Sequence, residues 1–198
     1  MILRCATGNA GKLAEFRRAA EALDAAGIEI LPIEGIRELP PCEEDGATFE
    51  ANAVKKALHY SAYCEEFLFA DDSGLEVEAL GGAPGVQSAR FSPEGTDEAN
   101  NRLLLERLRG LEDRRARFVC VIALARQGRL EATFRGEAEG EVLEAPQGRE
   151  GFGYDPLFLY PPLGRTFAEL DAETKMQVSH RGEALRRLFR YLADFRAR

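Results

Sequence analysis

The sequence predicts an α/β protein in which helices surround a mixed central sheet, arranged as two lobes with a cleft between them. Two observations lead to this fold class. Short apolar segments alternate with helical patterns over residues 2–70, which favours strands joined by helices. Apolar segments at 118–125 and 130–134 flank the turn residues 126–129, which indicates an antiparallel hairpin. The length suits one α/β unit, so we expect a single domain, 1–198.

The first half of the chain contains strands and helices in turn. The expected elements are a strand at 2–6, a helix at 11–26, a strand at 29–33, a helix from 48 to about 64 and a strand at 67–70. Thr48 is the expected N-cap of the second helix, because a hydroxyl at that position accepts a hydrogen bond from a free backbone N–H.

The second half begins with a helix that runs from Thr96, its expected N-cap, to Arg109 and stops before Gly110. Beyond the hairpin, Ser179 is expected to open the last helix. Apolar residues recur in this helix at helical spacing and predict one packed face, formed by Leu185, Leu188, Leu192 and Phe195.

Composition and charge exclude several classes of protein. The formal net charge of −8 argues against general nucleic-acid binding, which needs a broad basic surface. No apolar stretch is long enough to span a bilayer, and residues 1–5 lack the pattern of a secretory leader. The four cysteines show neither CxxC spacing nor nearby histidines, so we expect reduced thiols in a cytoplasmic protein. We expect neither a nucleic-acid nor a membrane partner.

The first candidate site is the turn Thr7-Gly8-Asn9-Ala10-Gly11-Lys12, between a strand and a helix. Glycines let a ligand approach the backbone, a helix N-terminus offers free N–H groups to an anion, and Lys12 adds a positive charge. The turn is not a P-loop, because Ala6 and Leu13 stand where that motif needs Gly and Ser or Thr. Phosphate binding and a purely structural turn both remain open.

The second candidate is Asp71-Asp72-Ser73-Gly74, which we place where a buried strand ends. Ligands of open α/β sheets bind at the carboxyl ends of strands. Adjacent side chains of an extended chain point in opposite directions, so we expect only one of the two aspartates to face the cleft. A solvated turn is the alternative, since Asp, Ser and Gly all form turns. Adjacent aspartates differ from the alternating DxD pair of haloacid-dehalogenase phosphatases.

Three further motifs have both a functional and a structural interpretation. Glu44 could share a hard cation with an aspartate of the second motif, or the acidic segment 43–45 could simply favour the start of the next helix. Phe152 could stack on a base beside Asp155, or it could be a core anchor. The basic pair His180-Arg181 opposes the dipole of the last helix, a local conflict that is expected at functional sites.

Together, and in this order, these segments resemble the inosine triphosphate pyrophosphatase family (dITP/XTP pyrophosphatases). The resemblance covers residues 3–192. Its motifs are Thr7-Gly8-Asn9-x-Gly11-Lys12, Thr48-Phe49-Glu50-x-Asn52-Ala53-x-x-Lys56, Asp71-Asp72-Ser73-Gly74-Leu75, Gly82-Ala83-Pro84-Gly85-x-x-Ser88-Ala89-Arg90, Phe152-Gly153-Tyr154-Asp155-Pro156 and Ser179-His180-Arg181. Ala51 departs from the pattern, because bacterial members often carry a second Glu there.

The resemblance implies an elongated α/β fold, usually a homodimer, that uses Mg²⁺ to hydrolyse ITP, dITP and XTP to the monophosphate and pyrophosphate. It implies that Asp72 is the proton acceptor and a metal ligand, with Glu44 as a second metal contact. The implied triphosphate-binding residues are Thr7, Gly8, Asn9, Ala10, Gly11, Lys12 and Lys56. The residues implied to contact the rest of the substrate are Ser73, Phe152, Gly153, Tyr154, Asp155, Lys175, His180 and Arg181.

Base selection follows from hydrogen-bond polarity. Hypoxanthine and xanthine present a 6-oxo acceptor and an N1–H donor, so Arg181 would donate to O6 and Asp155 would accept from N1–H. Adenine reverses both groups. The nearest rival function is a Maf-type pyrophosphatase that acts on pyrimidine or modified nucleotides. A regulatory nucleotide-binding module without catalysis and a purely structural domain are the other two alternatives.

Overall fold

The structure, a computed structural model, describes residues 1–22 and 27–196. In these residues seven strands form one sheet in the order β2-β1-β3-β4-β5-β6-β7. The strands are β1 Ile2–Cys5, β2 Glu29–Pro32, β3 Phe67–Val77, β4 Arg115–Arg126, β5 Arg129–Val142, β6 Phe158–Tyr160 and β7 Arg165–Thr166. β1 pairs in parallel with β2 and β3, whereas every pair from β3 to β7 is antiparallel. The predicted mixed sheet is confirmed.

Five α-helices of the described residues accompany the sheet: α1 Ala10–Ala22, α2 Phe49–Ser61, α3 Asp97–Arg107, α4 Ala172–Val178 and α5 His180–Arg196. Short 3₁₀ helices are η1 Glu78–Leu80, η2 Gly85–Arg90, η3 Pro161–Leu163 and η4 Phe167–Glu169. The predicted caps are confirmed: the hydroxyls of Thr48, Thr96 and Ser179 accept backbone hydrogen bonds at 3.1, 3.3 and 3.2 Å. The expected extension of the first helix to Ala26 lies outside the described residues.

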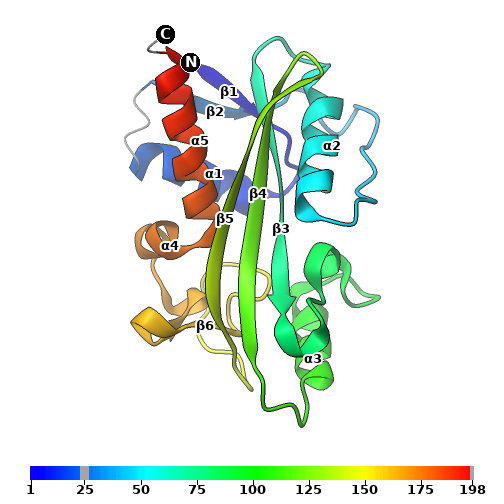
Figure 1. The fold of residues 1–198 in the computed structure, drawn as a ribbon, viewed down its shortest axis with the longest axis vertical. Coiled ribbons are helices and arrows are strands. Elements are labelled where there is room, and N and C mark those ends of the chain that lie inside the picture. The colour runs from blue at the N-terminus through cyan, green and yellow to red at the C-terminus, as the bar shows by residue number, and fades with distance from the viewer. Residues whose placement is uncertain (23–26, 197–198) are drawn as a thin grey trace.

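The helices cover the two faces of the long strands separately. Figure 1 shows an elongated molecule with α2 on one side of β3, β4 and β5 and α5 on the other. Leu68 and Ala70 of β3 point toward α2, whereas Phe69 between them packs against Phe16 of α1 and the apolar side of α5. The period of two along a strand therefore separates two cores. A third core lies at the far end, between α3 and the segment around Phe158.

Three strands are longer than predicted. β4 begins at Arg115, before the expected start at 118. β5 runs to Val142, beyond the expected end at 134. β3 does not stop at Ala70 but continues to Val77, because β4 supplies hydrogen-bond partners along that whole stretch. Asp71 and Asp72 are thus residues of the strand, and placing them at its end was wrong. The hairpin itself is confirmed: Gln127 and Gly128 both have positive φ, at 49° and 74°, which matches the twist of paired strands.

The strand order places an open edge at the middle of β3. β1 pairs with β3 only as far as Cys5 and Phe69, after which the chain turns away into α1. The neighbours β2 and β3 lie on opposite sides of β1, so the strand order reverses there, and ligands of open α/β sheets bind at such points. Beyond Phe69, one edge of β3 is therefore free to line a cavity.

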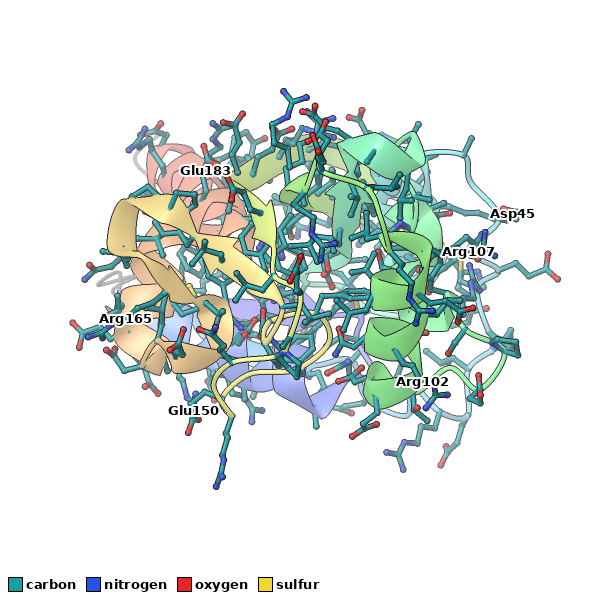
Figure 2. All side chains as sticks on the ribbon, turned by 90° about the horizontal axis from the view of Figure 1, so that it is seen from below. Asp45, Arg102, Arg107, Glu150, Arg165 and Glu183 are labelled. Carbon is teal, nitrogen blue, oxygen red and sulfur yellow. The ribbon has the colours of Figure 1, made fainter. Side chains whose placement is uncertain are left out.

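The outer surface of the molecule is strongly charged. Figure 2 shows the side chains of Asp45, Arg102, Arg107, Glu150 and Arg165 around the periphery. Of the predicted apolar face of α5, Leu185, Leu188 and Leu192 are fully buried. Phe195 is 44% exposed, but its ring packs edge-on against the buried ring of Phe67, with centroids 5.2 Å apart, so it lies at the exposed end of the packed face. No helix within the described ranges meets the length and apolarity that a membrane span requires.

Candidate active site

A cavity of about 400 Å³ opens at the free edge of β3. Its walls come from the turn after β1, the acidic segment before α2, η2, the 151–155 loop and the start of α5. The sequence-predicted residues that line it are Thr7, Gly8, Asn9, Lys12, Glu44, Lys56, Asp72, Ser73, Phe152, Gly153, Tyr154, Asp155, His180 and Arg181. Ala10, Gly11 and Lys175 do not line it.

A second hollow, of about 1210 Å³, lies between α3 and residues 144–157. It shares Asp97, Phe152 and Gly153 with the smaller cavity, but no lysine lines it among the described residues. Both Lys12 and Lys56 line the smaller cavity. By volume alone the larger hollow would be the candidate active site. The lysines and Asp72, however, line the smaller cavity.

The turn after β1 is organised by Asn9. Its side-chain oxygen accepts the backbone N–H of Lys12 at 3.0 Å, which is the hydrogen bond of a helix N-cap. This capping role was not predicted. A Cβ at Gly11 would lie 3.3 Å from the ring of Phe152, so the absence of a side chain lets this ring approach the helix. Gly11 therefore shapes the wall of the cavity without lining it.

Asp71 and Asp72 have different surroundings although they are adjacent. Asp71 faces α1 and α5, where the ammonium group of Lys12 lies 2.7 Å from its carboxylate. Burial opposes ionisation of Asp71, but Lys12, Arg181 and Lys56 outweigh it and lower the pKa of this carboxyl to about 2. Asp71 is thus ionised, and the positive charge of Lys12 balances its negative charge.

Asp72 faces α2 and makes no ion pair within the described residues. Its carboxylate accepts hydrogen bonds from the Nδ2 of Asn52 at 3.0 Å and from the backbone N–H of Ser73 at 3.1 Å. Burial raises the pKa of Asp72, against the attraction of Lys56 and the hydrogen bond from Asn52. Both aspartates line the cavity, which lies at the strand edge, so the expectation that only one would do so was wrong.

The acidic segment before α2 contributes Glu44. The ammonium group of Lys56 lies 2.7 Å from its carboxylate, and Arg90 donates to its backbone carbonyl at 2.8 Å. Asp45 instead pairs with exposed Lys55. Burial disfavours the charge of Lys56, but Asp71, Glu44 and Asp72 outweigh that effect and raise its pKa. Lys56 therefore stays protonated among these carboxylates.

The 151–155 loop is anchored to η2 and to α3. The hydroxyl of Tyr154 donates to the carbonyl of Ser88 at 2.8 Å, and this ring is 4% exposed. The backbone of Gly153 is held on both sides, since its N–H donates to Asp97 at 2.7 Å and its carbonyl accepts from Asn101 at 2.9 Å. Tyr154 is therefore a structural anchor whose ring closes one side of the cavity.

A buried network of four charges connects α1, the 151–155 loop, α4 and α5. The ammonium group of Lys175 lies 2.6 Å from Asp155 and 2.8 Å from Glu15. Glu15 also pairs with Arg181, which donates through its other terminal nitrogen to Ser73 at 3.0 Å. The cations of Lys175 and Arg181 lie 5.3 and 5.4 Å from the ring centre of Phe152. Both cations thus lie beside this ring, which lines the cavity.

A family model described as the Ham1 family matches residues 3–191 of this chain. The chain belongs to the Ham1 family. A dITP/XTP pyrophosphatase from Acidobacterium capsulatum is 51% identical to this Ham1-family chain, with 94% of this chain and 95% of that protein covered. One from Thermus thermophilus is 47% identical, with 96% and 90% covered. The Ham1 protein of Staphylococcus aureus has a similar structure, with a TM-score of 0.86, 37% identity and coverage of 98% and 99%.

Sequence reasoning gave no role to Glu15 or Asn52, two polar residues that hydrogen-bond to side chains lining the cavity of this Ham1-family chain. Glu15 follows Lys12 by three positions on a helix, so it lies on the same helical face, and that spacing was a usable signal. Asn52 stands one helical turn before Lys56 on α2 and is 1% exposed. A buried amide needs partners, but only the folded chain shows that one of them is Asp72.

His180 is buried without a hydrogen bond to its Nδ1 from any described residue. Its ring stacks on Phe118 with centroids 4.6 Å apart. Burial, together with the charges of Arg181, Lys175 and Lys12, lowers the pKa of His180 well below the ordinary value of 6.5. His180 is thus neutral in the folded protein.

We expect His180 to make stability depend on pH. Below pH 6.5 the unfolded chain binds a proton at this residue that the folded chain does not. The free energy of unfolding therefore decreases as the pH is lowered, by up to about 1.4 kcal/mol for each pH unit. Urea unfolding at pH 7.5, 6.5 and 5.5 should show this slope in the wild type and a shallower one in His180→Phe. Parallel stability profiles for the two proteins would contradict the assignment.

Proposed function

We propose that this chain hydrolyses the non-standard purine nucleoside triphosphates ITP, dITP and XTP to the monophosphate and pyrophosphate. The observation that carries the proposal is one cavity lined both by Lys12 and Lys56 and by Asp72, a carboxylate without an ion-pair partner among the described residues. A pure phosphate binder gains nothing from such an acid beside an anionic ligand. The names of the relatives from Acidobacterium capsulatum and Thermus thermophilus support the same substrates.

The donor set fits Mg²⁺. No group of three or more His, Cys, Asp or Glu side chains that could hold a metal occurs in residues 1–22 and 27–196. Mg²⁺ needs no such cage, because it binds proteins through one or two carboxylates and completes its coordination with waters and substrate phosphates. Glu44 and Asp72 line the cavity together and would hold the ion. When bound, it supplies charge neutralisation at the phosphates.

The side chains of the cavity divide the remaining work. Lys12 and Lys56 hold the triphosphate, and their present partners, Asp71 and Glu44, keep them positioned before it arrives. The turn before α1 adds backbone N–H groups at a helix N-terminus. Asp72 accepts the proton of the water that attacks the α-phosphorus. The unpaired carboxylate is better suited to this role than Asp71, which Lys12 already neutralises.

The base is held between Phe152 and the start of α5. Arg181 is expected to reach the 6-oxo group and Asp155 the N1–H, but both terminal nitrogens of Arg181 already bind Glu15 and Ser73. Its Nε is the donor left without a partner among the described residues, and it is buried. Each terminal nitrogen carries a second N–H, so the oxo contact can form while Arg181 keeps both Glu15 and Ser73. If Arg181→Ala keeps the wild-type preference for ITP over ATP, the contact is wrong.

The substrate class is tested with a panel of nucleotides. Purified protein with Mg²⁺ should hydrolyse ITP, dITP and XTP with a far higher kcat/KM than ATP, GTP, UTP or dTTP. A site that pairs a substrate N1–H rejects adenine, which lacks that group, by about 10⁴–10⁵-fold. Guanine shares the N1–H and the 6-oxo group, so this contact does not by itself separate GTP from ITP. A preference for UTP or dTTP would favour the Maf-type alternative. Binding without turnover of any nucleotide would favour a regulatory module.

The assembly and location of the protein are further parts of the proposal. We propose a homodimer that acts in the cytoplasm, where nucleotide pools are used, and a single two-lobed domain with the cleft between its lobes. Light scattering during size-exclusion chromatography checks the assembly. A mass twice that of the 21.9 kDa chain supports the dimer, and a mass of one chain contradicts it.

A further inference from the structure

Asn52 hydrogen-bonds to one proposed metal ligand, Asp72, and to the backbone of the segment that carries the other, Glu44. Its Nδ2 donates to the Oδ2 of Asp72 at 3.0 Å. Its Oδ1 accepts the backbone N–H of Gly46 at 2.7 Å, two residues after Glu44. Asn52 is 1% exposed and sits on α2, which packs against β3. One amide therefore ties the strand that carries Asp72 to the segment that carries Glu44.

The segment that carries Glu44 fits closely around this amide. A Cβ on Gly46 would lie 2.6 Å from the Oδ1 of Asn52, so any larger residue would push the segment away from α2. Arg90 holds the carbonyl of Glu44, and Lys56 holds its carboxylate. Of these three supports, Asn52 is the one that also fixes Asp72.

Resting on the function proposed above, we infer that Asn52 is a positioning residue that sets the separation and orientation of Glu44 and Asp72 for a divalent cation. Its amide suits this role because it donates to the carboxylate and accepts from the backbone at once, and it adds no charge. Partners that orient metal ligands typically contribute 10–100-fold to metal affinity. A residue that only stabilised α2 would contribute to folding and not to metal affinity.

Metal affinity is measured with Mn²⁺ by electron paramagnetic resonance, using the uncleavable α,β-methylene analogue of ITP and the Mn²⁺–analogue complex alone as the blank. Asn52→Leu keeps the size of the side chain and removes both hydrogen bonds, so we expect about 10–100-fold weaker Mn²⁺ binding. Thr48→Ala is the matched control, because it removes the cap of the same helix without touching either carboxylate. It should lower stability and leave the affinity unchanged.

The outcomes separate this inference from the proposed function. If the wild type binds no Mn²⁺, the proposed metal site fails and the inference with it. If the wild type binds and Asn52→Leu binds equally well, only the inference is overturned. If Asn52→Leu does not fold, Mn²⁺ affinity is measured for Gly46→Ala instead, because the added methyl group displaces the hydrogen bond between the Gly46 backbone and Asn52. Unchanged Mn²⁺ affinity in Gly46→Ala also overturns the inference. Raising Mg²⁺ should restore turnover to Asn52→Leu, whereas Asp72→Asn should stay inactive.

Discussion

Asp72→Asn is expected to lower kcat by about 10²–10⁴-fold, the usual loss when a general base is removed. Asn52 and the backbone N–H of Ser73 donate to different oxygens of Asp72, so the single oxygen of asparagine can keep one of these hydrogen bonds, and the fold should be retained at some cost in stability. The amide cannot take a proton from water and is a poor ligand for a hard cation. Steady-state kinetics with ITP, together with circular dichroism, measure the loss and check the fold.

Two matched aspartates control this experiment. Asp45→Asn removes a carboxylate from the exposed pair with Lys55 and should leave kcat unchanged, because this pair lies outside the cavity. Asp71→Asn removes the partner of Lys12, so it should disturb triphosphate binding and raise KM more than it lowers kcat. If Asp71→Asn instead abolishes kcat while Asp72→Asn turns over normally, the proton acceptor is Asp71 and our assignment is wrong.

Glu15→Gln is expected to destabilise the folded protein by about 3 kcal/mol. The substitution leaves Lys175 and Arg181 with only Asp155 as a directly paired carboxylate, so one cation stays buried without a counter-charge. Burial raises the pKa of Glu15, but Arg181 and Lys175 outweigh it and hold that pKa below its ordinary value. The stabilisation is therefore present above pH 4.5 and is lost as the pH falls further.

Urea unfolding at pH 7 measures this cost. Glu94→Gln is the control, because Glu94 and Arg102 form an ion pair that is more than half exposed on both sides. Exposed pairs contribute less than about 1 kcal/mol. Equal losses in the two variants would mean that the network around Glu15 is not buried as the structure has it. The Glu15 variant should also show weaker discrimination between bases, because Glu15 holds Arg181 beside Phe152.

Local signals made several elements predictable from sequence. Thr48 and Thr96 cap helices through hydrogen bonds to residues three positions away, so the whole interaction lies within one short segment. The turn at 127–128 depends only on the backbone preference of its own residues. The length of β3 was not predictable in this way. Asp71 to Gly74 form turns readily, and they are held in a strand by β4, some fifty residues away.

In the candidate site, too, local sequence signals indicate some features, whereas others depend on contacts between distant segments. Order and spacing of motifs led to most of the predicted residues that line the cavity, but also to Ala10, Gly11 and Lys175, which do not line it. The partners of these residues depend on the fold: Lys12 meets Asp71, and Arg181 meets Glu15, across more than fifty residues of chain. Tyr154 shows the limit most clearly, since its hydroxyl binds a backbone carbonyl that no motif would indicate. Contacts between distant segments must be seen in the structure.

The central claim is that water attacks the α-phosphorus of the nucleotide. Hydrolysis of ITP in ¹⁸O-labelled water, followed by mass spectrometry of the products, tests it most directly. We predict inosine monophosphate that carries the label and pyrophosphate that does not. Label in pyrophosphate would place the attack on the β-phosphorus. Release of orthophosphate and inosine diphosphate would contradict the proposed reaction altogether.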